Sequence, residues 1–208
     1  MTMEQSLAAF TIAAALLTIT PGLDTALVLR AATDQGRRAA LFAGAGICLG
    51  CLAWGALVAA GLGALIEASP FAYSMLKAAG AAYLIYLGIK LIMTSAGAPR
   101  TAGAVAGAGQ SAWFRRGLLT NLLNPKVGVF YTAFLPQFVP GEANVALFTL
   151  LLALIHAMLG MLWFLLLAQM TVPMGRYLRS PKLSHWLDRA LGGLLLLVAA
   201  RMIQTART

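Results

Sequence analysis

The stretch Thr20-Pro21-Gly22-Leu23-Asp24 interrupts an apolar run near the start of the chain. The residues on both sides of it, 7–19 and 25–29, are largely apolar. Proline removes a backbone hydrogen bond and clashes with the preceding helical turn, and glycine adds backbone freedom. We therefore predict a helix that breaks at Pro21-Gly22, with the Asp24 side chain capping the helix that follows.

The composition is that of a polytopic membrane protein. Hydrophobic residues make up 61% of the 208 residues and charged residues only 10%, whereas soluble domains carry about a quarter charged residues. The net charge of +9 lies in short gaps between apolar runs and forms no continuous basic face, which argues against nucleic-acid binding. The N-terminal segment has no basic residue before its apolar core, so we expect it to be retained.

Six apolar segments are long enough to cross a lipid bilayer as helices, because roughly 20 apolar residues span a ~30 Å hydrocarbon core. Long uniform apolar runs argue against a membrane barrel. We predict an all-α fold with one transmembrane domain over residues 1–208, and a polar loop at about 95–114. The predicted spans are 5–30, 39–66, 70–94, 117–139, 144–172 and 189–204.

The basic residues fall in alternate gaps between these spans. Because Lys and Arg favour cytoplasmic loops, the first, third and fifth gaps are expected in the cytoplasm and both termini in the periplasm. Trp113 and Trp186 lie beside these gaps and are expected in an interfacial aromatic belt. The basic residues in and beside the three gaps are Arg30, Arg37, Arg38, Lys90, Arg100, Arg115, Arg116, Arg176, Arg179, Lys182 and Arg189.

A second break is predicted at Asn124-Pro125-Lys126. Asn is favoured at a helix N-cap and Pro at the first helical position, so a half-helix should begin at residues 124–125. Pro21 and Pro125 are 104 residues apart, half of the 208-residue chain. This spacing predicts two antiparallel three-helix repeats, residues 1–104 and 105–208, which is the plan of many secondary transporters.

The two breaks predict a polar site between the first and fourth spans. Helix N-termini and unwound carbonyls carry opposite partial charges, and together they suit a zwitterion. A charge inside a span is costly and usually marks a pathway or a partner. Asp24 and Lys126 are therefore expected to pair directly or to share a substrate; solvation at the cytoplasmic surface, or proline kinks that only shape packing, are the alternatives. The predicted substrate-binding residues are Thr20, Pro21, Gly22, Asp24, Asn121, Asn124, Pro125 and Lys126.

Two further side chains inside spans each allow two interpretations. His156 can relay protons near neutral pH or hydrogen-bond to a neighbouring helix. Lys77 can extend to the outer surface along its aliphatic stem or line a pathway. Asp24 is the first candidate for proton coupling and His156 the second.

Cys48 and Cys51 form a CxxC motif within the second span. This spacing is typical of dithiol chemistry, but on a helix it also suits close packing, which the Gly46/Gly50 GxxxG motif favours. The same motif leaves a homo-oligomer open. We find no Walker, HExxH or GxSxG motif, so no catalytic residue, metal or cofactor is expected, and the protein is not expected to be an enzyme.

Three stretches resemble the LysE/RhtB family of bacterial amino-acid exporters. Residues 20–29 (TPGLDTALVL) resemble its first-span motif, usually Pro-Gly-Pro followed by Asn or Asp, with Leu23 in place of the second proline. Residues 76–88 (LKAAGAAYLIYLG) are similar to its third span, and residues 114–138, beginning FRRGLLTNLLNPKVGVF, match its longest motif. The resemblance covers nearly the whole chain.

The resemblance implies a six-span exporter of amino acids or close derivatives in the inner membrane, commonly driven by the proton gradient. The expected partners are an amino-acid substrate, protons and the lipid bilayer, with proton antiport as the mode of transport. The resemblance also implies distant kinship with membrane thiol carriers, whose cysteines lie at the two breaks, where this chain has none. A thiol-disulfide electron carrier that uses Cys48 and Cys51 is therefore the alternative function, and a scaffold without transport is a second.

Overall fold

The computed structural model of the chain describes residues 2–93, 109–169 and 181–205, and its regular elements within these ranges are all helical. This confirms the predicted all-α class for the described part of the chain. The elements are α1 (Met3–Ile19), α2 (Leu23–Ala68), α3 (Pro70–Met93), α4 (Gln110–Leu122), α5 (Pro125–Val129), the π-helix η1 (Phe130–Phe134), the 3-10 helix η2 (Leu135–Phe138), α6 (Val145–Gln169) and α8 (Pro181–Thr205).

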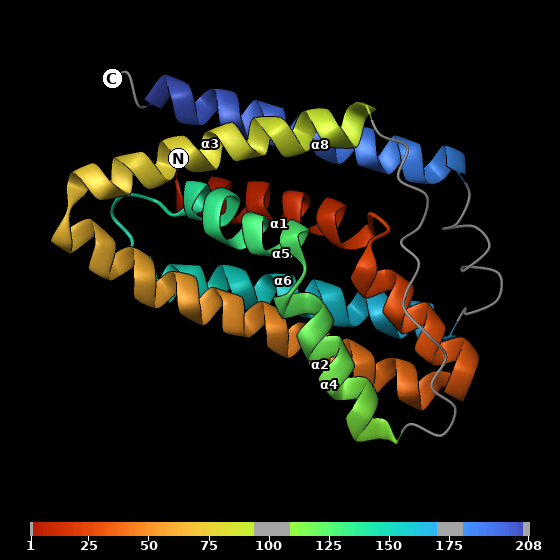
Figure 1. Ribbon diagram of the computed structural model, residues 1–208. Coiled ribbons are helices and arrows are strands. Elements are labelled where there is room, and N and C mark those ends of the chain that lie inside the picture. The colour runs from red at the N-terminus through yellow and green to blue at the C-terminus, as the bar shows by residue number, and fades with distance from the viewer. Residues whose placement is uncertain (1, 94–108, 170–180, 206–208) are drawn as a thin grey trace.

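The chain runs back and forth between the two ends of an elongated molecule (Figure 1). α1 and the first part of α2 cross from one end to the other, and the rest of α2 returns. α3 crosses again, the segment from α4 to η2 returns, and α6 and α8 make the final two crossings. The start of α1 and the end of α8 consequently lie at the same end, as does the corner between α2 and α3.

A sharp corner at Gly36 separates the two arms of α2. Gly36 has φ 79° and ψ −174°, a conformation that side chains with a Cβ atom rarely adopt. A methyl group at this position would have no neighbouring atom within 4 Å, so the backbone conformation, and not close packing, requires the glycine. The corner lies in the first gap between predicted spans, where a turn was expected.

The helices pack in pairs around a central core. α2 packs against α4 and α6, α3 packs against α8, and α1 lies against α6 (Figure 1). Aromatic rings fill the space between α1 and the segment from η1 to η2. Phe10 of α1 contacts Phe130 and Phe138, with ring centroids 5.8 and 5.6 Å apart. This core fixes the position of the segment that follows the second break.

Glycines allow α4 to approach α2 closely. A methyl group at Gly46 would overlap the Phe114 carbonyl, and one at Gly117 would overlap the Ala43 carbonyl. The GxxxG motif of Gly46 and Gly50 therefore serves packing within the chain, as the packing interpretation predicted. Because α4 covers this face, the motif gives no support to a homo-oligomer.

Two described helices are long and apolar enough to cross a membrane, Leu23–Gly61 and Val145–Gln169. Met3–Ile19 and Ala78–Met93 are apolar but shorter. The predicted span boundaries were less accurate at two places. α4 begins at Gln110, inside the predicted loop 95–114, of which residues 95–108 lie outside the described ranges, and α8 begins at Pro181 instead of residue 189.

The prediction of an interfacial belt is wrong for Trp113. Its side chain is 0% exposed, and its Nε1 donates a hydrogen bond to Gln35 Oε1 at 2.9 Å. Trp113 therefore ties the start of α4 to the residue before the Gly36 corner. Trp186 of α8 is 63% exposed, which is compatible with the predicted belt.

Candidate functional site

The first break lies where the sequence predicts it. α1 ends at Ile19, Thr20 is extended with φ −67° and ψ 117°, and α2 begins at Leu23. The prediction that Asp24 caps α2 is wrong. Asp24 lies in the first helical turn, and its carboxylate bonds to side chains on the far side of the site instead of to its own backbone.

The second break also agrees with the prediction. α4 ends at Leu122, and Pro125 is the first residue of α5. Asn124 is the N-cap, and its Oδ1 accepts a hydrogen bond from the Lys126 backbone N–H at 3.1 Å. Only the side-chain oxygen of Asn124 is used in the cap, so its Nδ2 amino group stays free to donate hydrogen bonds elsewhere.

Hydrogen bonds cross between the two breaks in both directions. Asn121 Nδ2 donates to Asp24 Oδ2 at 2.9 Å, and Asn124 Nδ2 donates to Asp24 Oδ1 at 3.4 Å. In return, Lys126 Nζ donates to the Thr20 carbonyl at 3.4 Å. Residues that are about 100 positions apart in the sequence thus form one polar cluster.

A pocket opens beside this cluster, with a volume of about 490 Å³ when its open mouth is included. Clefts lined by apolar side chains and a few converging polar groups commonly hold small molecules. Of the predicted substrate-binding residues, the pocket is lined by Thr20, Gly22, Asp24, Asn124 and Lys126. Pro21, Asn121 and Pro125 shape or support the site but do not line the pocket.

The two opposite charges in the pocket are not paired with each other. Asp24 and Lys126 are both half-buried, and no ion pair joins them within 4.0 Å in the described part of the chain. The two amides that hold the Asp24 carboxylate belong to buried side chains. The arrangement therefore fits a shared ligand better than a direct salt bridge.

His156 lies on the pocket wall formed by α6. It is buried, and its Nδ1 is 3.0 Å from the hydroxyl of Tyr131 in η1, which is also buried. This contact matches the expectation of a hydrogen bond to a neighbouring helix. Because His156 also lines the pocket, a role in proton transfer stays a proposal.

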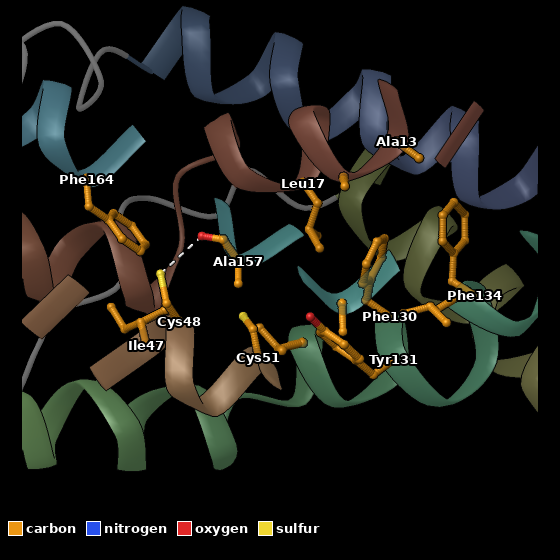
Figure 2. Close-up of a cluster of buried hydrophobic side chains, with 14 of the residues drawn as sticks. Ala13, Leu17, Ile47, Cys48, Cys51, Phe130, Tyr131, Phe134, Ala157 and Phe164 are labelled. Atoms are coloured by element: carbon orange, nitrogen blue, oxygen red, sulfur yellow. Dashed lines mark hydrogen bonds between the residues drawn. The ribbon is translucent and has the colours of Figure 1, made fainter. Parts of the chain in front are cut away.

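The two cysteines pack against different helices. Cys48 Sγ donates to the Ala157 carbonyl of α6 at 3.3 Å, as the dashed line in Figure 2 shows. Cys51 Sγ accepts from Asn121 Nδ2 of α4 at 3.5 Å. Both thiols are buried and free. Each cysteine thus joins α2 to a neighbouring helix.

Asp188 is a buried carboxylate that the sequence analysis missed. It lies in α8, is 5% exposed and interacts electrostatically with Lys126. The predicted sixth span began one residue later, which left Asp188 in a polar gap. The signal that could have found it is a lone acidic residue at the edge of an apolar run. Lys77 lies in α3, but its side chain is outside those that the structure describes.

Comparisons with known proteins find relatives over nearly the whole chain. The family model for LysE type translocators matches residues 15–205. The homoserine/homoserine lactone efflux protein of Salmonella typhimurium is 33% identical over 202 residues, which cover 96% of both chains. The leucine efflux protein of an Enterobacter species is 29% identical over 195 residues, covering 93% of this chain and 92% of that protein.

An uncharacterised membrane protein of Bacillus subtilis is 30% identical over 198 residues, which cover 91% of this chain and 94% of that protein. No solved structure matches the chain significantly. The matched region contains both helix breaks, the pocket and most of the six predicted spans. A family model that spans nearly the whole chain, and relatives of nearly equal length, place this membrane protein in the LysE type translocator family.

Proposed function

We propose that the protein is a secondary transporter that exports amino acids or close derivatives across the bacterial inner membrane. The observation that carries the proposal is that Asp24 and Lys126 line one pocket without forming an ion pair with each other. A zwitterion has an ammonium for the carboxylate and a carboxylate for the ammonium. The efflux proteins of homoserine and leucine among the relatives support the same substrate class.

Separated opposite charges are suited to binding such a ligand. Charges taken out of water are costly unless they are paired and hydrogen-bonded. Asn121 and Asn124 partly compensate the Asp24 carboxylate, and the Thr20 carbonyl and the Asp188 carboxylate partly compensate Lys126. A bound amino acid would complete the pairing at both ends without creating net charge.

We further propose six membrane spans in a 3+3 inverted repeat, residues 1–104 and 105–208, with both termini in the periplasm. The start of α1 and the end of α8 lie at the same end of the molecule, which supports this topology (Figure 1). The corner at Gly36 is flanked by Arg37 and Arg38, which favours the cytoplasm for the opposite end.

Transport would be coupled to protons as an antiport. Asp24 is the proposed coupling group, because a carboxylate that binds the substrate ammonium can bind a proton in its place. His156 is the second candidate, since it lies on the same pocket. Competition between proton and substrate for one carboxylate would link inward proton movement to outward amino-acid movement.

Flux from proteoliposomes tests this function. Vesicles that contain the purified protein and radiolabelled leucine or homoserine should lose label faster than protein-free vesicles. The loss should accelerate when the outer buffer is made more acidic than the lumen. Efflux equal to that of protein-free vesicles would refute transport, whereas efflux that ignores the pH gradient would refute only the proton coupling.

Replacing Gly22 by alanine is expected to reduce efflux without unfolding the protein. A methyl group at Gly22 would lie 3.9 Å from both Lys126 Nζ and the Thr20 carbonyl oxygen, which is ordinary contact distance. It would, however, occupy pocket space beside the ammonium. We expect leucine efflux to fall by about tenfold, as for other changes of one methyl group in a binding pocket. Protein content in the membrane, measured by immunoblot, should match the parent protein.

The cysteine variants Cys48→Ser and Cys51→Ser distinguish the exporter from the alternative thiol carrier. A serine hydroxyl can donate to the Ala157 carbonyl, as the Cys48 thiol does, and can accept from Asn121, as Cys51 does. An exporter should therefore retain efflux within about twofold in each variant, because the hydrogen-bond partners are kept. Loss of activity in both variants at normal protein levels would instead favour thiol chemistry.

A further inference from the structure

We infer that one wall of the pocket, formed by Ala157, Gly160 and Phe164 of α6, contacts the side chain of the transported amino acid and limits its size. We also infer that this wall selects uncharged side chains. The inference rests on the proposed function and deepens it, since it assigns the part of the substrate that differs between amino acids to a defined surface.

The pocket has two chemically different parts. The two helix breaks supply the charged and polar groups, Asp24, Asn124 and Lys126 among them. Three of the four α6 residues that line the pocket, Ala157, Gly160 and Phe164, are apolar; His156 is the fourth, and Ile47 of α2 continues the apolar surface. An amino acid whose ammonium and carboxylate bind at the breaks must place its side chain in the remaining, apolar part.

The wall residues share one face of α6. Residues 157, 160 and 164 follow the three- and four-residue spacing that brings side chains together on a helix. The hydrogen bond from Cys48 to the Ala157 carbonyl holds this face against α2 at 3.3 Å (Figure 2). The wall is therefore fixed by a direct bond between the two helices that form it.

Phe164 is the bulkiest of the four apolar wall residues. Its side chain is 4% exposed and lies against α2 at Gly44, where an added methyl group would come within 3.1 Å of the phenylalanine side chain. The ring therefore occupies the space that a longer substrate side chain would need. Among the described residues that line the pocket, Asp24 is the only carboxylate. A lysine substrate whose α-ammonium binds Asp24 would therefore leave its terminal ammonium without a carboxylate partner.

Gly160 is the position at which pocket length can be changed with little strain. A methyl group there would contact only Cys48 Sγ and Phe164 Cε2 within 4 Å, each at 3.7 Å. These are ordinary contact distances, so the helix packing tolerates alanine. The added volume would face the same space as the substrate side chain.

The test measures efflux of alanine, leucine and lysine from proteoliposomes that contain the full chain. The parent protein should export alanine and leucine, and lysine at least tenfold more slowly. Gly160→Ala should lower the ratio of leucine to alanine efflux by about tenfold, the discrimination expected for one methyl group. Phe164→Ala should raise the same ratio, because it lengthens the apolar part.

Gly193→Ala in α8 is the matched control, because a methyl group there has no neighbour within 4 Å. It should leave the ratio unchanged. If Phe164→Ala is not recovered as folded protein, Gly160→Ala alone decides the question. An unchanged ratio in Gly160→Ala, an equal loss of alanine and leucine efflux, or efficient lysine efflux by the parent would overturn the inference. An unchanged ratio in Gly160→Ala, or efficient lysine efflux by the parent, would leave export itself intact. A parent protein that moves no amino acid would instead refute the proposed function.

Discussion

Replacing Asp24 by asparagine is expected to lower leucine efflux by about 10- to 100-fold, the range that corresponds to the loss of a hydrogen bond to a charged group. Asparagine keeps the size of the side chain and can still contact Asn121 and Asn124, but it cannot pair with an ammonium. Asp24→Ala should abolish export in the same way. Because Asp24 lies at a pocket and not in a packed core, membrane insertion should be retained. The measurement is the initial rate of efflux, normalised to immunoblotted protein.

Lys126→Gln provides the matched comparison. It removes the proposed partner of the substrate carboxylate, so leucine efflux should fall, whereas efflux of homoserine lactone, which has no free carboxylate, should fall much less. Asp24→Asn should reduce both, since both ligands carry an ammonium. Equal effects of the two variants on both ligands would contradict the proposed orientation of the substrate, and full activity of Asp24→Asn would contradict the site.

Replacing Gly117 by alanine should destabilise the protein strongly. The new methyl group would overlap the Ala43 carbonyl, and the three nearest atoms all belong to the backbone of α2, so no flexible side chain can move aside. Overpacking typically costs about 1–3 kcal/mol, and we expect the upper end here because α4 must separate from α2. In a chain of this size such a loss lowers the melting temperature by about 5–10 °C. Melting of the detergent-purified protein, followed by intrinsic fluorescence, measures the effect.

The control for this variant is Gly61→Ala in α2, where a methyl group would have no neighbour within 4 Å. Alanine is favoured over glycine in a helix by about 1 kcal/mol. This variant should therefore melt at the same temperature as the parent protein or slightly above it. If Gly117→Ala were as stable as Gly61→Ala, the close approach of α4 to α2 would be wrong.

Local signals in the sequence predicted both helix breaks. Pro21-Gly22 and Asn124-Pro125 act through backbone chemistry that does not depend on distant residues, so their positions agree with the structure. The contacts of Asp24 could not be found in the same way. Its position beside a helix start favoured a cap, but two amides from the second break compete for the carboxylate, and only the folded chain brings them close.

Two other differences have the same origin. Trp113 borders a basic gap, which is typical of an interfacial side chain, but Gln35 offers a buried acceptor for its N–H. Asp188 was missed because the hydropathy of the sequence places the start of the last span after it. In the structure α8 begins at Pro181, so Asp188 lies within the helix and its side chain is buried. The sequence alone therefore predicted the helices and the positions of the two breaks. It did not predict which side chains tertiary packing brings together, such as Trp113 with Gln35 and Asp188 with Lys126.

The hydrogen bonds that cross between the two breaks have a consequence for leakage. A substrate ammonium that binds Asp24 must displace the amides of Asn121 and Asn124 or share the carboxylate with them, and a substrate carboxylate that binds Lys126 must displace the Thr20 carbonyl or share the ammonium with it. The groups that join one helix break to the other are thus the groups that a cargo molecule would occupy. We expect the empty protein to be latched in one state, and either a bound substrate or a proton on Asp24 to release it, so that the protein changes state only when it carries one or the other.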